Sequence, residues 1–325
     1  MKKINKIVAI QGDSLHLLNK ETDTTLLLAA EAQRRNYKIY YYQTKDLTFA
    51  NNKVFAFCKE VEFDTSKKKI YKIKNIKKID LSKVPFILMR QNPPFNVDYI
   101  TATFLLEKIS HKTKILNDPS AVRNVPEKLS SIYFTKFMPP SIFTTDIKEI
   151  IKFRKKYKEI VIKPTHGFGG NRIFFVNSQT NTNKISSYLK QNKHVMAQKF
   201  LPQIKRGDKR VFIIDGKVKG AIKRVPKEKS IISNLGQGGT AVKTKLNISE
   251  MNVAKKVAFF LKRNNILFAG IDLISNYLIG DINVTSPTGL KNFKDLSGID
   301  LSIDIWDCLE KKNTTTSQDH FTPNK

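Results

Sequence analysis

The feature that most constrains this chain is a late stretch in which acidic and amide side chains alternate with apolar ones. Asp281 and Asn283 flank Ile282, and a short apolar segment separates them from Gly270–Ile271–Asp272. Residues two apart on a strand point to the same face, so Asp281 and Asn283 would share a face with Asp272 on a paired strand. The pattern predicts a hairpin that displays three oxygen donors above a buried side.

Oxygen donors of this kind suit Mg²⁺, which prefers hard ligands and keeps coordination positions open for phosphate. The following segment, Thr285–Gly289, combines hydroxyls with backbone N–H groups in a turn that is able to hold a carboxylate. The same stretch also fits an acidic hairpin closed by an Asx-turn. A choice between these interpretations depends on the rest of the chain.

The chain has 325 residues, enough for two or three subdomains with a substantial core. Its first apolar run is short and leads into Gln11–Gly12–Asp13, so we expect a buried strand rather than a signal peptide. No stretch has the apolar length needed to cross a bilayer. Cys58 and Cys308 lie far apart without metal-ligand spacing, which indicates a reducing compartment. We therefore expect a cytoplasmic protein with no membrane partner.

Lysine and arginine outnumber aspartate and glutamate by 58 to 28, which gives a formal net charge of +30. Such an excess, when clustered, is typical of proteins that bind nucleic acid or membranes. Here it is mostly scattered lysine without interleaved aromatic residues, so we expect no nucleic-acid partner. Arginine is scarce, and Arg90, Arg210 and Arg224 are informative because a guanidinium binds carboxylate or phosphate through two hydrogen bonds.

The first third of the chain alternates strand and helix patterns, as in a small α/β domain with parallel strands. In such sheets ligands bind beyond the carboxyl ends of the strands, where Asp13, Arg90 and Asn117 are predicted. The turn residues Asn117–Ser120 mark a plausible domain boundary. The expected strands are 4–11, 37–43, 54–63, 86–89 and 114–117, the expected helices are 23–35 and 97–110, and 66–83 is expected to be a lysine-rich hairpin.

The rest of the chain mixes short strands with helices. Its last residues, Asn313–Lys325, are polar and are expected to be disordered. The expected strands are 160–164, 173–176, 194–202, 211–214 and 217–223, and the expected helices are one containing Lys128, one ending near 157, 249–264 and 301–311.

A glycine-rich loop joins two predicted strands at Lys163–Asn171. Gly167, Gly169 and Gly170 allow the backbone to approach a bound group closely, and Lys163 adds a cation beside it. These features favour a phosphate ligand. The loop lacks the ending of a Walker motif and precedes no predicted helix, so an ordinary tight hairpin turn is the alternative.

A predicted strand at Val195–Pro202 ends in a linker that proline defines. Backbone N–H and C=O groups of such a linker suit the edge of an adenine ring. The alternative is a simple connector between domains.

Seven short motifs follow one another along the chain between Asp23 and Asp307. They are Asp23–Thr25, Glu31–Arg35, Leu88–Phe95, Val122–Leu129, Gly207–Val211, Gly270–Asp272 and Ile282–Gly289. Together and in this order they closely resemble the prokaryotic-type glutathione synthase family of ATP-grasp ligases.

The resemblance implies an α/β fold with ATP-grasp architecture. An N-terminal parallel α/β domain would span 1–122, and two α+β subdomains, 123–202 and 203–312, would clasp the nucleotide, with the metal site in the second and a disordered tail at 313–325. The implied reaction joins γ-glutamylcysteine to glycine with ATP as co-substrate. The implied cofactors are two Mg²⁺ ions, for which Mn²⁺ would substitute, and the implied assembly is a homotetramer.

The resemblance also assigns roles to individual residues, with Lys128 and Lys163 gripping the phosphates. The implied ATP contacts are Lys128, Lys163, Gly167, Gly169, Gly170, Gln198, Lys199, Phe200, Leu201, Asp208 and Arg210. The implied substrate contacts are Asp23, Arg90, Asn234, Gly238, Gly239, Ser286 and Thr288. The implied catalytic residues are Arg210 and Arg224, and the implied metal ligands are Asp272, Asp281 and Asn283.

This chemistry needs cations rather than a nucleophilic side chain. A carboxylate becomes reactive by attacking the γ-phosphoryl group of ATP, and an amine then displaces phosphate from the acyl phosphate, so negative charge gathers on oxygens in both steps. The acyl phosphate must be shielded from water, which requires a lid. The glycine-rich segment Val225–Ala241 has the composition of one.

Two features depart from the family pattern. Asp281 stands where a bridging glutamate is usual, with Gly280 as an extra residue before it, and Ile232 and Thr240 stand where lid arginines are usual. These departures keep two alternatives open. One is an ATP-grasp carboxylate–amine ligase with another acid or amine substrate, and the other is a nucleotide-binding protein whose catalytic site has decayed.

Overall fold

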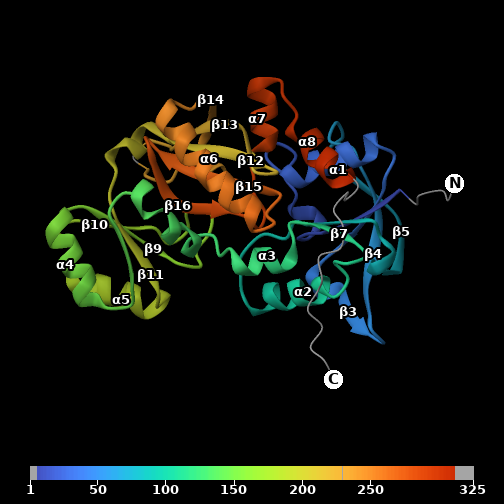
Figure 1. The fold of residues 1–325 in the computed structure, drawn as a ribbon, viewed down its shortest axis with the longest axis horizontal. Coiled ribbons are helices and arrows are strands. Elements are labelled where there is room, and N and C mark those ends of the chain that lie inside the picture. Colours follow the sequence, from blue (N-terminus) through green and yellow to red (C-terminus); the bar gives the residue numbers. More distant parts are fainter. Residues whose placement is uncertain (1–5, 229, 312–325) are drawn as a thin grey trace.

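The computed structural model describes residues 6–228 and 230–311, so the predicted tail from Asn313 lies outside the described part. Three β-sheets follow one another along the chain, with seven, four and five strands. In Figure 1 the four-stranded sheet and its helices lie at one end of the molecule, the seven-stranded sheet lies at the other, and the five-stranded sheet is between them. The architecture is α/β, as the sequence predicts.

The seven-stranded N-terminal sheet has a parallel centre. Its elements are β1 Ile7–Gln11, α1 Thr24–Arg34, β2 Lys38–Tyr42, β6 Phe86–Met89, α2 Val97–Glu107, β7 Lys114–Leu116 and α3 Pro119–Asn124. The parallel strands run in the order β2-β1-β6-β7. Val8 and Ile10 pack against α1 while Ala9 packs with residues of α2 and α3, so β1 is buried on both faces. The carboxyl ends of β1 and β6 therefore form a fixed edge.

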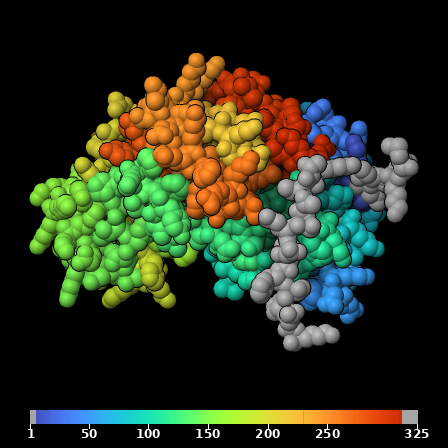
Figure 2. All heavy atoms as spheres, viewed as in Figure 1, coloured from blue at the N-terminus to red at the C-terminus, as the bar shows by residue number. Residues whose placement is uncertain are grey.

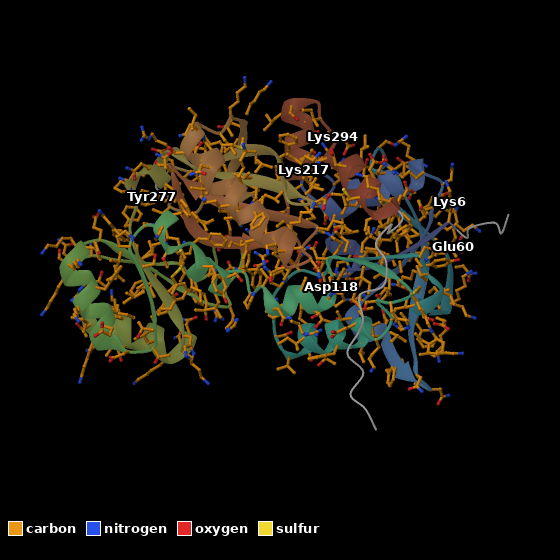
Figure 3. All side chains as sticks on the ribbon, viewed as in Figure 1. Lys6, Glu60, Asp118, Lys217, Tyr277 and Lys294 are labelled. Carbon is orange, nitrogen blue, oxygen red and sulfur yellow. The ribbon has the colours of Figure 1, made fainter. Side chains whose placement is uncertain are left out.

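Three antiparallel strands extend this sheet: β3 Leu47–Ala50, β4 Lys53–Phe63 and β5 Tyr71–Asp80. β5 is exposed along most of its length and carries lysines, which discourage pairing of an open sheet edge with another chain. Lysines elsewhere lie on separate elements, and in Figure 3 the labelled Lys6 lies at the N-terminal end, apart from Lys217 of β13 and Lys294 of α7. The positive charge is thus spread over the surface.

The four-stranded central sheet is antiparallel, in the order β10-β9-β11-β8. Its elements are β8 Ser141–Thr144, α4 Ile147–Tyr157, β9 Ile160–Pro164, β10 Phe174–Val176, α5 Thr182–Asn192 and β11 Val195–Lys199. Ile160 and Ile162 pack with apolar residues of α4 and α5 on one face. Strand alternation turns Val161 and Lys163 to the other face, which looks towards the C-terminal sheet.

The five-stranded C-terminal sheet is also antiparallel, in the order β14-β13-β12-β15-β16. Its strands and associated helices are β12 Asp208–Ile214, β13 Lys217–Val225, β14 Thr240–Lys243, α6 Ile248–Arg263, β15 Phe268–Ile274, β16 Tyr277–Asn283, α7 Leu290–Ser297 and α8 Leu301–Glu310. Apolar residues of α6 pack with Val211 and Ile271 on one face. Arg210 and Asp272, one residue along, therefore project from the opposite face.

The last helix returns to the N-terminal domain. Trp306 of α8 is fully buried and its Nε1 donates to Leu28 O of α1 at 2.9 Å, which ties the end of the chain to the N-terminal core. In Figure 2 the red C-terminal helices lie against the blue N-terminal part. Within the described residues, every helix is too short or too polar to cross a bilayer.

Several predicted elements need correction. Lys128 is not inside a helix but directly precedes a 3-10 helix at Leu129–Phe137. Asn117 faces no ligand pocket, because its amide donates to Phe268 O and Val284 O, each at 2.7 Å, and ties β7 to the C-terminal sheet. The sequence analysis also missed β3, β14, α5 and α7. The helix α5 buries only Ile185 and Leu189, so its apolar pattern is too sparse to stand out.

Candidate active site

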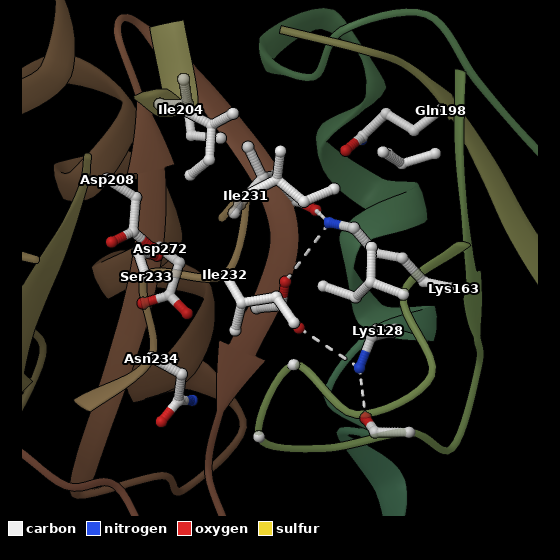
Figure 4. A pocket seen from close by; sticks show the side chains of 18 of the residues that line it. Lys128, Lys163, Gln198, Ile204, Asp208, Ile231, Ile232, Ser233, Asn234 and Asp272 are labelled. Atoms are coloured by element: carbon white, nitrogen blue, oxygen red, sulfur yellow. Dashed lines mark hydrogen bonds and ion pairs between the residues drawn. The ribbon is translucent and has the colours of Figure 1, made fainter. Parts of the chain in front are cut away.

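A cleft of about 920 Å³, open solvent included, separates the central and C-terminal sheets. Figure 4 shows Lys163 and Gln198 projecting from the central subdomain and Asp208 and Asp272 from the C-terminal sheet, with Lys128 below. Polar and charged side chains of both sheets therefore face one cleft.

Alternating charges cross the C-terminal sheet. Arg210 lies opposite Asp272 and donates to it from Nε at 2.5 Å and Nη2 at 3.0 Å. Arg224 lies opposite Asp208, donates to it through Nε at 2.9 Å and through Nη2, and also reaches Asp272 Oδ2 at 3.0 Å. Burial alone would raise the pKa of Asp272, but the two arginines outweigh burial and lower it. The acids likewise raise the pKa of Arg224 against burial, so Arg224 and Asp272 both favour their charged forms.

Two lysines converge on Asp281. Lys128 Nζ lies 3.2 Å from Asp281 Oδ1 and Lys163 Nζ lies 3.6 Å from Asp281 Oδ2. Burial favours the protonated acid, yet the charges of the two lysines outweigh it and lower the pKa of Asp281 to about 2. Burial also lowers the pKa of Lys163, and Asp281 opposes that shift. Asp281 is thus an internal counter-ion for both lysines.

A bulge in β16 carries Asp281 to these lysines. Ile271 pairs with Ile282 and Leu273 with Leu278, so Asp272 alone lies opposite the segment 279–281. Gly280 has a φ of +90° at this bulge, where glycine is favoured. The Ile279 carbonyl, released from regular pairing, accepts a hydrogen bond from Lys163 Nζ at 3.1 Å. The extra residue noted in the sequence therefore forms the bulge.

Replacing Gly280 by alanine is expected to destabilise the protein and weaken ADP binding. A Cβ at this position would lie 2.9 Å from Met196 Cε, in addition to the strain of positive φ. Gly298→Ala is a matched control, since Gly298 has a φ of +78° with no atom near its Cβ position. In urea unfolding we expect Gly298→Ala to cost about 1 kcal/mol and Gly280→Ala at least about 1 kcal/mol more. Equal costs, with unchanged ADP titrations, would contradict this interpretation of the bulge.

The lid and the glycine loop meet over the cleft. The lid joins β13 to β14 through residues 226–228 and 230–239, and Gln237 Nε2 donates to Asn171 Oδ1 of the loop at 2.8 Å. A Cβ on Gly170 would lie 2.8 Å from Ile232 Cγ2, and Lys128 Nζ donates to Gly167 O. The loop is therefore held between Lys128 and the lid. Ile232 of the lid lines the cleft.

One side of the cleft is apolar. Its lining includes Val161, Ile173, Phe200, Leu201, Ile204, Ile231, Ile274 and Ile279. The linker after β11 borders this side, but Lys199 N donates to Pro140 O at 2.9 Å and Phe200 N donates to Glu159 O at 3.0 Å. These two N–H groups are occupied, so other groups of the linker would have to recognise an adenine edge.

A second pocket adjoins the cleft and reaches the N-terminal sheet. Both spaces are lined by Glu127, Phe168, Gly169, Arg210, Asn234 and Asn283. At the far side Arg90 is 4% exposed and donates to Thr25 Oγ1 at 3.3 Å and Pro287 O at 3.0 Å. Ser286 Oγ donates to Arg90 O at 3.1 Å. Charged groups from two domains therefore surround one continuous space.

Most of the residues singled out from the sequence meet at these two spaces. All eleven implied ATP contacts line the cleft, together with Arg224, Asp272, Asp281 and Asn283. Asp23, Arg90, Asn234, Ser286 and Thr288 line the second pocket. Gly238 lines neither space, and Gly239 instead borders a separate groove with Thr240 beside α7. These two glycines thus lie apart from the predicted substrate contacts.

The sequence analysis missed Glu127. This acid lines both spaces, and its Oε1 accepts from Val284 N at 3.1 Å, Thr285 N at 3.2 Å and Thr285 Oγ1 at 2.8 Å. Glu127 directly precedes Lys128, so these bonds hold the end of β16 beside that lysine. In the sequence, Glu127 stands next to Lys128, a predicted phosphate contact, within the Val122–Leu129 motif, and this position could have identified it as a site residue.

The predicted metal ligands are hard oxygen donors on one face of β15 and β16. Among the described residues, no three His, Cys, Asp or Glu side chains gather as a complete metal site. Asp272, Asp281 and Asn283 nevertheless line one cleft with the lysines and arginines, and Mg²⁺ is commonly held by one or two carboxylates plus nucleotide phosphates. The donor set therefore fits a metal that arrives with a nucleotide.

Comparison with known proteins agrees with this geometry. Residues 7–123 match the family model of the prokaryotic glutathione synthetase N-terminal domain, and residues 127–298 match that of the prokaryotic glutathione synthetase ATP-grasp domain. A D-cycloserine synthetase, DcsG, has a similar fold, with a TM-score of 0.64 at 14% identity over 94% of this chain and 100% of that one.

Curated relatives extend the match over nearly the whole chain. A glutathione synthetase of Agrobacterium fabrum is 37% identical over 96% of this chain and 98% of its own length. One from Rhodopseudomonas palustris is 38% identical over 94% and 98%, respectively. Both domain models and both relatives agree in the order and extent of the match, so the chain belongs to the prokaryotic glutathione synthetase family of ATP-grasp enzymes.

Proposed function

We propose that this protein is an ATP-dependent carboxylate–amine ligase that joins γ-glutamylcysteine to glycine and releases glutathione, ADP and phosphate. The observation that carries the proposal is the convergence of Lys128 and Lys163 on Asp281, beside the paired Arg210 and Arg224. Such a cluster can exchange its internal ion pairs for phosphate and metal. The named relatives supply the substrate class.

In the first step the cysteinyl carboxylate attacks the γ-phosphorus of ATP, and the bond to the bridging oxygen of ADP breaks. Lys128 and Lys163 hold the phosphates, and the arginines stabilise the charge that develops on the transferred group. These groups are already charged and placed by the sheet, so little reorganisation opposes the reaction.

In the second step the glycine amine attacks the acyl carbon, and phosphate leaves. Two Mg²⁺ ions, or Mn²⁺ in their place, would be held by Asp272, Asp281 and Asn283 and would supply Lewis-acid stabilisation of the phosphate oxygens. The lid keeps water from the acyl phosphate, and the bond from Gln237 to Asn171 helps to hold it over the loop.

Further properties follow from the family resemblance as part of the proposal. The protein is expected to work as a homotetramer in the cytoplasm, with no nucleic-acid partner. We expect domain borders near residues 122 and 202, with the nucleotide bound between the second and third domains. The described thiols Cys58 and Cys308 are both free, as a reducing compartment requires.

The test is product formation by the purified protein. With Mg-ATP, γ-glutamylcysteine and glycine we expect equal amounts of glutathione, ADP and phosphate, and no glutathione when either partner is omitted. A different acid that outcompetes γ-glutamylcysteine would favour a ligase of other specificity. The lid residue Ile232 is the reason for considering that alternative. ADP binding without turnover of any acid would favour a decayed site.

A further inference from the structure

The second pocket carries an unusual charge arrangement at the N-terminal sheet. Asp13, Asp23 and Arg90 all line it, yet within the described residues none of the three forms an ion pair with another side chain. Elsewhere in the two connected spaces, Arg210, Arg224, Asp272 and Asp281 are all paired. Charges left without protein partners in a pocket are suited to a charged ligand.

Arg90 is the buried member of this group. Its Nε and Nη2 donate to Thr25 Oγ1 and Pro287 O, which are neutral acceptors. A guanidinium that is 4% exposed and lacks a carboxylate partner costs free energy until an anion supplies one. A ligand carboxylate would therefore bind Arg90 through charge-assisted hydrogen bonds.

Asp13 and Asp23 supply negative charge to the same pocket. Asp23 Oδ1 accepts from Thr25 N at 2.7 Å at the start of α1, and Asp13 Oδ2 accepts from Asn92 N at 3.1 Å. Tyr41 OH donates to Asp13 O at 2.6 Å. The charges of Asp23 and Asp13 both raise the pKa of Tyr41 in addition to burial, while Arg90 opposes them, so all three charged groups act on one hydroxyl.

Gly12 allows this close arrangement. A Cβ on Gly12 would lie 2.1 Å from Tyr41 OH, so no other residue permits the hydroxyl to reach the Asp13 carbonyl. The backbone of Asp13 is therefore held by its place after β1 and by Tyr41, and its carboxylate is held by the Asn92 N–H. A carboxylate held in this way is suited to a positioned recognition role.

We infer that Asp13, with Asp23, binds the α-ammonium group of the γ-glutamyl end of the acid substrate, while Arg90 binds its α-carboxylate. This inference rests on the proposed function and deepens it by assigning the end of the substrate that is remote from the reaction. The cysteinyl carboxylate then points along the pocket to Asn283 and Arg210, which border both spaces. Asp13 acts as a specificity-determining residue.

The test compares γ-glutamylcysteine with N-glutarylcysteine, which lacks the α-amino group. In the unaltered protein we expect kcat/KM to be about a hundredfold lower for N-glutarylcysteine, because removal of the ammonium leaves Asp13 and Asp23 without a partner. In Asp13→Asn we expect kcat/KM for γ-glutamylcysteine to fall about a hundredfold and that for N-glutarylcysteine to change less than about threefold. The KM for ATP is expected to stay the same.

The control is Asp98→Asn, an exposed acid of the same domain, which should leave both substrates unaffected. An unaltered protein that uses both acids equally well would overturn the inference while leaving glutathione formation intact. An equal loss for both acids in Asp13→Asn would overturn it too, because it would indicate a structural role. If the unaltered protein forms no glutathione at all, the proposed function itself fails.

Discussion

Replacing Lys163 by methionine is expected to lower kcat/KM about a thousandfold. Lys163 is 5% exposed, and its ammonium lies in the cleft within reach of Asp281 and the Ile279 carbonyl, where a transferring phosphoryl group would need a cation. Loss of one preorganised group that stabilises developing charge typically costs about two to three powers of ten in rate. Steady-state kinetics with Mg-ATP and both substrates measures the effect.

Lys184→Met is the control for this substitution, because Lys184 is exposed on α5 of the same subdomain and remote from the cleft lining. It is expected to retain full activity. A Lys163→Met protein that folds normally and loses less than about tenfold would show that this ammonium does not act on the transferred group.

Replacing Asp281 by asparagine is expected to tighten the binding of ADP without metal and to lower turnover. In the ligand-free protein Asp281 occupies Lys128 and Lys163, so ADP without metal must compete with a carboxylate for both ammonium groups. Removal of that charge should tighten metal-free ADP binding about tenfold, which corresponds to about 1.4 kcal/mol. Turnover should fall at least about a thousandfold, since a proposed metal ligand is lost.

Calorimetric titration of ADP, with chelator and with Mg²⁺, separates these two effects. Asp215→Asn is the matched control, because Asp215 lies in the β12–β13 turn and, among the described residues, its ion-pair partner is exposed Lys262 at 3.5 Å. It should leave both titrations unchanged. If Asp281→Asn weakens ADP equally with and without Mg²⁺, the counter-ion exchange is wrong.

The amino-acid sequence predicts the parts of this fold whose patterns are local. The period-two alternation around Ile282 gives β16 its correct faces, and Asp23 is the N-cap of α1 as expected. The glycine loop between β9 and β10 lies where the sequence indicates, and all the implied ATP contacts line one cleft. Strong periodicity and special residues carry this information.

Other features depend on contacts between distant segments and leave no local trace. The bond network of Glu127 to Thr285 joins two parts of the chain that lie 158 residues apart. Asn117 follows a strand in the position of a ligand-binding residue, but tertiary structure turns it to backbone groups of the C-terminal sheet. The helix α7, eight residues long, buries only Leu290 and Phe293. Sequence patterns cannot distinguish such cases before the domains are packed.

The balanced lining of the cleft has a consequence for how the protein behaves among the anions of a cell. The chain is strongly basic overall, but four cations of the cleft, Lys128, Lys163, Arg210 and Arg224, already pair with Asp208, Asp272 or Asp281. Inorganic phosphate or sulfate would have to separate these partners without bringing a replacement counter-charge. Only a ligand that brings negative oxygens and divalent cations together supplies partners for the basic and the acidic side chains of the cleft at once. We therefore expect the cleft to bind abundant small anions more weakly than a bare basic surface would.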